Sequence, residues 1–327
     1  MKFRVSVELP AARVQLCHGD HVLMLGSCFA EHVGRRMRDG GFRVEVNPFG
    51  VLYNPASILE ALKKLSAGLP RGMYFESGGM WHSWLHAGHF DGPTYDDCRR
   101  LVEERYEQAR QQFRRLTRLY VTWGTNRVYR VAGGEFAGHV VANCHKMPQR
   151  LFVEQVMTPD EIVAQWTPVL EQLLAEKPEL RIVLTVSPYR YAKYGFHGSQ
   201  LSKAALLLAA DELCRRFEGA CHYFPAYEIV TDELRDYRFY EADMLHPSGQ
   251  AVDYVWERFS DWSFDGETRN ILAEWEPLRR ALAHRPFHPQ TAAHSAFLQK
   301  IEQRVARLIE KYPNFAPGYG AGDGETV

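Results

Sequence analysis

The chain has 327 residues, of which 46% are hydrophobic and 24% charged, and 39 Lys and Arg against 40 Asp and Glu leave a formal net charge of -1. These values exclude a chain that is disordered throughout and give no support to nucleic-acid binding through bulk charge. No apolar run reaches the roughly 20 residues that cross a bilayer. The N-terminal residues lack the apolar core of a secretion signal. We therefore expect a cytoplasmic protein without a membrane span.

The cysteines contain no CxxC pair, so neither a zinc ribbon nor a thioredoxin-like site is predicted. Scattered cysteines without an export signal are expected to be reduced thiols.

Short apolar strands alternate with helices of 3.6-residue period through about residue 260. The predicted strands are 21–25, 42–46, 119–123, 181–186 and 222–224; the predicted helices are 28–38, 57–65, 98–118, 203–217, 247–259 and 292–312, with a further helix starting at Thr158. This order predicts the α/β class, with a mostly parallel sheet between helical layers. We expect a loop over 66–97 and a hairpin formed by 128–131 and 139–142.

The predicted α/β domain covers residues 1–263. Residues 264–327 are predicted to form a helical extension, because three prolines interrupt the segment before the last helix. Its Gly-rich tail from Pro317 is expected to be disordered.

A candidate nucleophile, Ser27, stands where the strand 21–25 meets the helix 28–38. Such a turn projects a side chain beyond the sheet edge and points backbone N–H groups at a developing oxyanion. A serine here is also typical of a plain helix N-cap, so the motif alone leaves both interpretations open. Cys28 could instead act as a thiol nucleophile. Neighbours on a helix point about 100° apart, so only one can face a given base, and we expect Cys28 to be a small buried packing residue.

The candidate base comes from the segment DMLHPS at 243–248. His246 can act as a general base, and Asp243 can orient its imidazole and offset the charge that develops on it. Pro247 suits the first turn of the following helix, which would place His246 at the N-cap. A turn aspartate beside a capping histidine is the alternative interpretation.

Candidate oxyanion donors follow the second and third strands. They are the backbone N–H of Gly50 and the side-chain amide of Asn126, with a turn glycine and a turn asparagine as the alternatives. Because ligands of doubly wound folds bind at the carboxyl ends of the strands, we expect these groups to meet there.

Several unusual strings occur in order: GSCFA (26–30), NPFGVLYNP (47–55), TWGTNRVYR (122–130), NCHKMPQ (143–149) and DMLHPS (243–248). Over about residues 15–260 the chain resembles the GSCFA family, which is similar to the SGNH/GDSL hydrolases. The resemblance implies a three-layer α/β/α sandwich with a flavodoxin-like sheet, a Ser27 nucleophile and an Asp243–His246 pair. It also implies oxyanion donors from the Ser27 N–H, Gly50 and an asparagine, for which Asn126 and Asn143 are both candidates.

The segment HSWLHAGH carries His82, His86 and His89. On a helix, His82 and His86 would share a face, as metal ligands often do. Gly88 argues against a helix and no Glu follows His82, so we predict no metal site. We expect His86 to line the substrate pocket and His145 to approach it. The aromatic segments 73–90 and 189–196 could form a platform for a sugar ring.

These features together predict a serine hydrolase of the SGNH type that cleaves a carboxylic ester, with an O-acetylated sugar as the expected substrate class. The acyl-enzyme would form on Ser27, without a metal or organic cofactor. Acyl transfer to a sugar hydroxyl by the same residues, and ligand binding without catalysis, are the alternatives.

Overall fold

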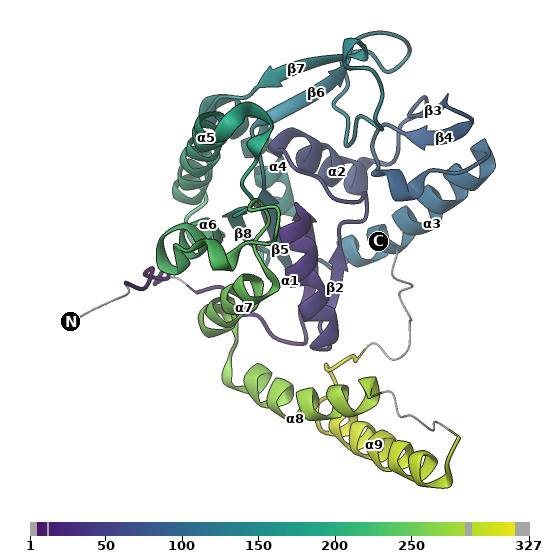
Figure 1. Ribbon diagram of the computed structural model, residues 1–327, viewed down its shortest axis with the longest axis vertical. Helices are drawn as coiled ribbons and strands as arrows, with labels where there is room; N and C mark the ends of the chain where they lie inside the picture. The colour runs from purple at the N-terminus through teal and green to yellow at the C-terminus, as the bar shows by residue number, and fades with distance from the viewer. Residues whose placement is uncertain (1–4, 12, 285–289, 318–327) are drawn as a thin grey trace.

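The computed structural model describes residues 5–11, 13–284 and 290–317. Its central sheet contains the parallel strands β1 (His21–Gly26), β2 (Arg43–Val46), β5 (Arg118–Trp123), β8 (Arg181–Val186) and β9 (Cys221–Tyr223), in the order β2-β1-β5-β8-β9 (Figure 1). Numbered along the chain, this order is 2-1-3-4-5, as in flavodoxin-like folds. The predicted α/β class and parallel sheet are confirmed.

Helices cover both faces of the sheet, which gives the three predicted layers. One face packs against α1 (Cys28–Asp39) and α7 (Gly249–Ser263), and the other against α2 (Pro55–Ala67), α3 (Tyr95–Arg114), α4 (Pro159–Glu176) and α5 (Gly195–Arg216). Successive strand residues point to opposite faces. Accordingly, Met24 of β1 belongs to the hydrophobic core on the α1 and α7 side, and Leu25 to the core under α2 to α5.

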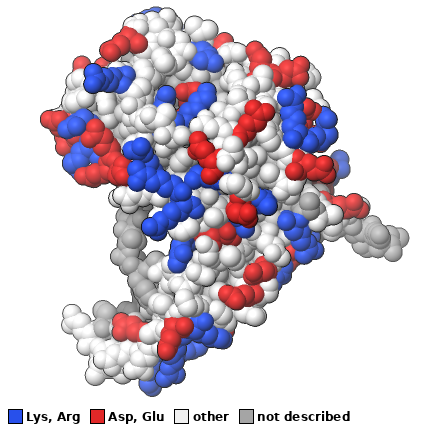
Figure 2. All heavy atoms as spheres, turned by 180° about the vertical axis from the view of Figure 1, so that it is seen from behind, with Lys and Arg blue, Asp and Glu red and all other residues white. Residues whose placement is uncertain are grey.

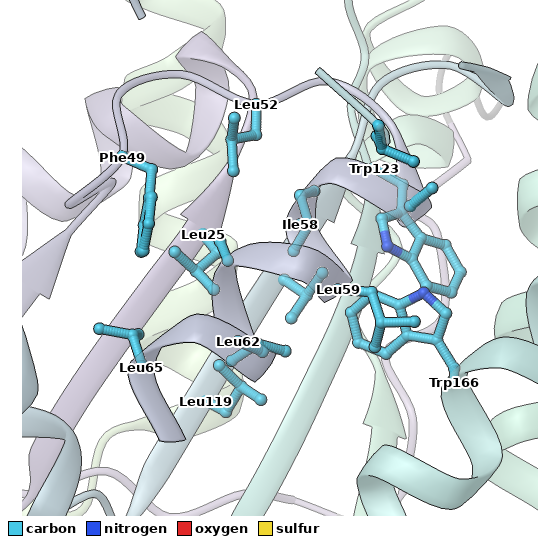
Figure 3. Close-up of a cluster of buried hydrophobic side chains, with 14 of the residues drawn as sticks. Leu25, Phe49, Leu52, Ile58, Leu59, Leu62, Leu65, Leu119, Trp123 and Trp166 are labelled. Carbon is cyan, nitrogen blue, oxygen red and sulfur yellow. The ribbon is translucent and has the colours of Figure 1, made fainter. Parts of the chain in front are cut away.

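The larger core is centred on α2. Figure 3 shows Leu59 and Leu62 of this helix over the sheet, near Leu119. Beside them, Trp123 and Trp166 meet edge to face with ring centroids 5.2 Å apart, a geometry that aromatic pairs prefer. Burial of each such side chain stabilises the fold by about 1.5–3 kcal/mol, so this core holds the carboxyl ends of β1 and β5 in place.

Two small antiparallel sheets are formed by segments that lie, along the chain, between strands of the central sheet: the first between β2 and β5, and the second between β5 and β8. They pair β3 (Tyr74–Ser77) with β4 (Met80–Ser83), and β6 (Arg127–Val131) with β7 (Phe152–Val156). The predicted loop over 66–97 is therefore wrong. The predicted hairpin of 128–131 with 139–142 is present as a short pairing: Arg130 forms an antiparallel bridge with Val140, and the N–H groups of Val131 and Val141 donate to the carbonyls of His139 and Tyr129 at 3.1 and 3.0 Å. The sequence did not indicate the strand β7, which also pairs with β6. Local alternation does not reveal a pairing across so long an excursion.

The helices α8 (Gly266–Ala283) and α9 (Ala292–Lys311) pack against each other below the α/β body (Figure 1). They share a separate hydrophobic cluster that includes Trp275 and Val305. The indole N–H of Trp275 donates to the carbonyl of Asp39 at 2.6 Å, which ties this pair to the end of α1. The predicted helical extension is thus present, whereas nearly all of the tail from Pro317 lies outside the described residues.

The face in Figure 2 carries Lys and Arg interspersed with Asp and Glu, without a broad field of one sign. Such a surface does not favour a polyanion over other partners. Among the described helices, none combines the length and the apolar character that a membrane span requires.

Candidate functional site

A pocket of about 590 Å³ opens at the carboxyl ends of the sheet strands. One part of its lining comes from the segments that follow these strands: Cys28, Tyr53, Asn54, Thr125, Tyr189, Tyr191 and His246. The other part comes from the inserted segments between β5 and α4 and includes Arg127, Tyr129, Asn143, Cys144 and Phe152. Its position matches the switch point between β1 and β5, where ligands of this fold class bind. Its size is that of a small-molecule site.

The structure brings Asp243 and His246 together. The Nδ1 atom of His246 lies 2.5 Å from Oδ2 of Asp243, whose Oδ1 accepts the backbone N–H groups of Leu245 and His246 at 2.8 and 3.0 Å. The side-chain hydrogen bond from His246, followed by these two backbone bonds, lowers the pKa of Asp243 to about 2. The carboxylate is therefore ionised and accepts the Nδ1–H, which leaves Nε2 of the imidazole free to take a proton.

The segment after β8 holds His246 in place. The ring of Tyr189 packs on the imidazole with centroids 4.3 Å apart. Arg190 donates its backbone N–H to the carbonyl of Leu245 at 3.0 Å and a guanidinium N–H to the carbonyl of Met244 at 2.9 Å. Met244 itself has a left-handed φ of 59°, a conformation that needs such support in a residue other than glycine.

Helix α7 begins later than predicted. Its N-cap is Ser248, whose side chain accepts the N–H of Ala251 at 3.3 Å. The prediction that His246 is the N-cap is wrong by two residues, because a serine that caps the helix follows Pro247. His246 therefore lies on a loop and is not bound into the first helical turn.

Ser27 does not reach the pocket. Its exposed fraction is 1%, and its Oγ has no hydrogen-bond partner among the described residues. Its N–H, predicted as an oxyanion donor, donates instead to the carbonyl of Thr122 at 3.3 Å. Gly26 permits this close approach of β1 and β5: with a φ of 145°, a Cβ there would lie 2.2 Å from the same oxygen. The structure thus places Ser27 at the N-cap of α1 with a buried side chain outside the pocket lining, contrary to the exposed position expected of a nucleophile.

Cys28, the first residue of α1, lines the pocket together with His246. The expectation that it is a buried packing residue is wrong. Because neighbouring side chains on a helix point in different directions, only one of Ser27 and Cys28 can face the pocket, and that residue is Cys28. Partial burial raises the pKa of Cys28, against an opposing effect of the amide groups of Phe29 and Cys28. The thiol is thus neutral at rest and needs a base to become a nucleophile.

Two of the predicted oxyanion donors are occupied elsewhere. The N–H of Gly50 donates to the carbonyl of Asn47 at 2.7 Å. The side-chain amide of Asn126 donates to the carbonyl of Met157, also at 2.7 Å. Neither residue lines the pocket, so both predictions are corrected: Gly50 and Asn126 are turn residues whose donors bond to nearby carbonyls of the chain.

Asn143 lines the pocket as predicted, and Asn54, which we did not predict, lines it too. Asn54 accepts the N–H of Ser57 at 2.8 Å through its Oδ1, and Asn143 accepts that of His145 at 2.7 Å. Each amide is thus held by its oxygen, and its Nδ2 remains as a donor. The signal for Asn54 was its place before Pro55 in NPFGVLYNP, which is typical of a helix start.

His86 and His145 do not line the pocket, and the expectation that they do is wrong. His86 is 1% exposed, stacks on Phe49 with centroids 4.8 Å apart and has its pKa lowered to about 3 by burial. The side chain of His145 is also 1% exposed. Both rings pack against aromatic side chains that do not line the pocket, His86 against Phe49 and His145 against Phe75. Of the two predicted aromatic platforms, the segment 189–196 contributes Tyr189 and Tyr191 to the lining, whereas 73–90 contributes no residue.

A buried lysine lies beneath the site. Lys203 of α5 is 2% exposed, and its Nζ donates to the carbonyls of Gly124 and Ser187 at 2.7 Å each. These two residues directly follow β5 and β8. Burial lowers the pKa of Lys203 to about 7. The side chain thus joins the ends of neighbouring strands below the pocket, a role that its sequence context, an Ala- and Leu-rich helix, did not indicate.

The fold and the site define an α/β protein of flavodoxin-like topology with an aromatic and polar pocket at the switch point of its sheet. The chain belongs to the GSCFA family, whose model matches residues 21–259. A second model, that of the GSCFA domain protein, C-terminal domain, matches residues 275–316.

No curated protein matches the chain. Among solved structures it is similar to "a putative platelet activating factor from Streptococcus pneumonia", at 10% identity and a TM-score of 0.38, over 74% of this chain and 82% of that one. At this TM-score the similarity bears on neither activity nor substrate.

Proposed function

We propose that the protein is an acyl hydrolase that cleaves a carboxylic ester of a small molecule, with an O-acyl sugar as the substrate class. We assign the nucleophile to Cys28 and the general base to His246, oriented by Asp243. The observation that supports this assignment is that Cys28 and His246 line one pocket, whereas Ser27 is buried outside it.

In the proposed reaction, the Cys28 thiol attacks the ester carbonyl carbon while Nε2 of His246 takes the thiol proton. The tetrahedral intermediate then expels the alcohol, which receives that proton, and an acyl thioester remains on Cys28. Water, deprotonated by His246, attacks the thioester and releases the carboxylic acid and the thiol. Asp243 stays ionised throughout and stabilises the imidazolium that forms in each half-reaction.

The oxyanion of the intermediate needs donors that are not already bonded. The N–H of Cys28 is one, because the first N–H groups of a helix have no intrahelical acceptor. The Nδ2 groups of Asn54 and Asn143 are two further candidates. Donors of this kind contribute about 2.7–4 kcal/mol each to transition-state stabilisation.

The rest of the lining supports a saccharide ester. Tyr53, Tyr189 and Tyr191 offer aromatic faces, and Arg127 offers hydrogen-bond donors beside them. Aromatic faces pack against the apolar faces of sugars, and fixed polar groups orient the hydroxyls.

The test measures hydrolysis of p-nitrophenyl acetate and of acetylated sugars by the wild type and by Cys28→Ala, Ser27→Ala and Cys144→Ala. Cys144 is the matched control, because it is a second thiol in the same pocket. We expect Cys28→Ala to lower kcat/KM by about 10³-fold or more, and the other two variants to stay within a few-fold of the wild type. Mass spectrometry of quenched turnover should find the acyl group on the peptide that contains Cys28.

Loss of activity in Ser27→Ala alone would return the nucleophile to Ser27, and labelling of that serine by a fluorophosphonate would support this outcome. Ligand binding without turnover on any ester, with no acyl adduct, would refute the hydrolase proposal.

A further inference from the structure

Three side chains from two separate segments of the chain meet beside the pocket. His82 lies on β4, Asp91 directly follows the short 3-10 helix Gly88–Phe90, and His145 lies on the segment that leads to β7. One ligand-type atom from each lies within 4.8 Å of the other two. The Nδ1 atoms of His82 and His145 approach the two carboxylate oxygens of Asp91 to 2.9 and 3.5 Å.

Neither approach has the geometry of a regular hydrogen bond. Nδ1 of His82, Nδ1 of His145 and Oδ1 of Asp91 are all buried and without a hydrogen-bond partner among the described residues. Such buried polar atoms are uncommon in native proteins and call for an explanation, which can be an ion. Three of them aimed at one another form a cluster that lacks only a cation at its centre.

The other ring nitrogens determine which atoms face that centre. Nε2 of His82 lies 3.2 Å from the carbonyl of Ser77, and Nε2 of His145 lies 3.0 Å from the carbonyl of Ser83. A carbonyl only accepts, so both Nε2 atoms carry the hydrogen. When a ring carries only this hydrogen, its Nδ1 atom presents a lone pair toward the carboxylate. Histidines that bind metals commonly donate their second N–H to a backbone carbonyl in this way.

We propose that His82, Asp91 and His145 form a site for a divalent transition-metal ion, Zn²⁺ being the ion that best suits the ligands. Two imidazoles and one carboxylate are a ligand set that Zn²⁺ takes with bonds of about 2.0–2.2 Å, so ligands around it stand roughly 3.3 Å apart. The observed 2.9 and 3.5 Å lie on either side of that spacing. Water would complete the coordination from the side of Asp91, whose side chain is 19% exposed against 1% for His145.

The ion would fix one wall of the pocket. His145 and the next residue, Lys146, have left-handed φ values of 47° and 56°, which marks a tightly held turn. Asn143, Cys144 and Met147 of the same turn line the pocket. A metal ion that joins this turn to the β3–β4 hairpin would therefore hold the pocket lining in place, whatever reaction the pocket performs.

The experiment uses the full chain, stripped with a chelator and titrated with Zn²⁺ by calorimetry and with Co²⁺ by visible absorption. The variants are His82→Gln, Asp91→Asn and His145→Gln, and the matched control is His89→Gln, an exposed histidine of the same segment. We expect one ion per chain for the wild type and the control, and at least tenfold weaker binding for each ligand variant. Zn²⁺ should also raise the Tm of the wild type and slow hydrogen exchange in residues 74–92 and 143–147.

Circular dichroism establishes whether each variant is folded. Should a variant fail to fold, the wild-type Co²⁺ spectrum still reports the ligands, because nitrogen and oxygen ligation of an enclosed site differs from that of aqueous Co²⁺. An absence of stoichiometric binding to the wild type would overturn the proposal and leave the cluster as an ion pair. Equal affinity in the ligand variants and the control would overturn it as well, by showing that the ion binds elsewhere.

Discussion

The pocket has two walls of different origin. One is the edge of the parallel sheet, where Cys28, Tyr189 and His246 follow the central elements of the fold. The other consists of the inserted segments, which bring Arg127, Asn143 and further residues to the opposite side. The two groups to which we assign the proposed chemistry, Cys28 and His246, lie on the sheet edge, whereas a second thiol, Cys144, lies on the inserted wall. The inserted wall adds shape and hydrogen-bond donors, a division typical of rigid scaffolds that carry variable loops.

The two walls are also held by different forces. The sheet edge is fixed by backbone pairing and by buried polar bonds, such as that from the N–H of Gly26 to Oδ1 of Asn47 at 2.9 Å. The inserted wall consists of two small sheets with backbone pairing of their own, which are joined by aromatic side chains: Phe75 stacks on Trp84 with centroids 3.6 Å apart, and Trp84 meets Phe152 edge to face. We therefore expect substitutions on the edge to change activity and substitutions in the insert to change local stability.

The largest effect is expected from His246→Gln. Removal of the base should lower kcat/KM by about 10²–10⁴-fold. Global stability should stay nearly constant, because the side chains of His246 and Asp243 are 46% and 43% exposed. Ester hydrolysis and urea unfolding of the same samples provide the two readouts. His32→Gln is the control, because this exposed histidine lies near His246 on α1 but outside the pocket. If His246→Gln keeps activity within a few-fold of the wild type, His246 is not the general base and the proposed site at the sheet edge is wrong.

The next effect is expected from Trp84→Ala in the insert. Loss of a buried indole costs about 3–5 kcal/mol, and Trp84 is 8% exposed. We expect hydrogen exchange to accelerate in residues 74–92 and 140–149, while the strands of the central sheet keep their protection. Trp81→Ala is the matched control, because Trp81 is only half-buried and should cost far less. Equal loss of protection in the central sheet would show that the two walls unfold as one unit.

The same contrast explains what the sequence could predict. Strand and helix periodicity is local, so the central sheet and its flanking helices could be predicted. The Asp243–His246 pair could be predicted as well, because both residues lie in the one short segment 243–248. The β3–β4 hairpin was missed although Gly78 and Gly79, with φ of 61° and 77°, form the two-residue turn that favours hairpins. The β6–β7 pairing and the meeting of Asp91 with His145 depend on contacts between distant segments, which no local pattern contains. The choice between Ser27 and Cys28 depends on which side chain the turn after β1 directs into the pocket. The sequence analysis chose Ser27, whereas Cys28 is the residue that lines the pocket.

The smallest effect concerns Lys203, which supports the sheet edge from below. Its pKa is lowered to about 7 in the folded chain from an ordinary value of 10.5. Between these values the unfolded chain binds one proton more than the folded chain, so this group makes stability rise with pH, by up to about 1.4 kcal/mol per pH unit. Below the folded pKa both states are protonated and the slope disappears.

Lys203→Met removes the titrating group and should remove this slope. Urea unfolding of both proteins at three pH values from about 7 to 9 gives the difference between their free energies of unfolding, in which the titration of other groups cancels. We expect this difference to shift in favour of the wild type as the pH rises. A constant difference would mean that the carbonyls of Gly124 and Ser187 keep the ammonium charged in the fold. In that case Lys203 would join the two strand ends as a buried ammonium ion, and not as the neutral amine that the lowered pKa implies.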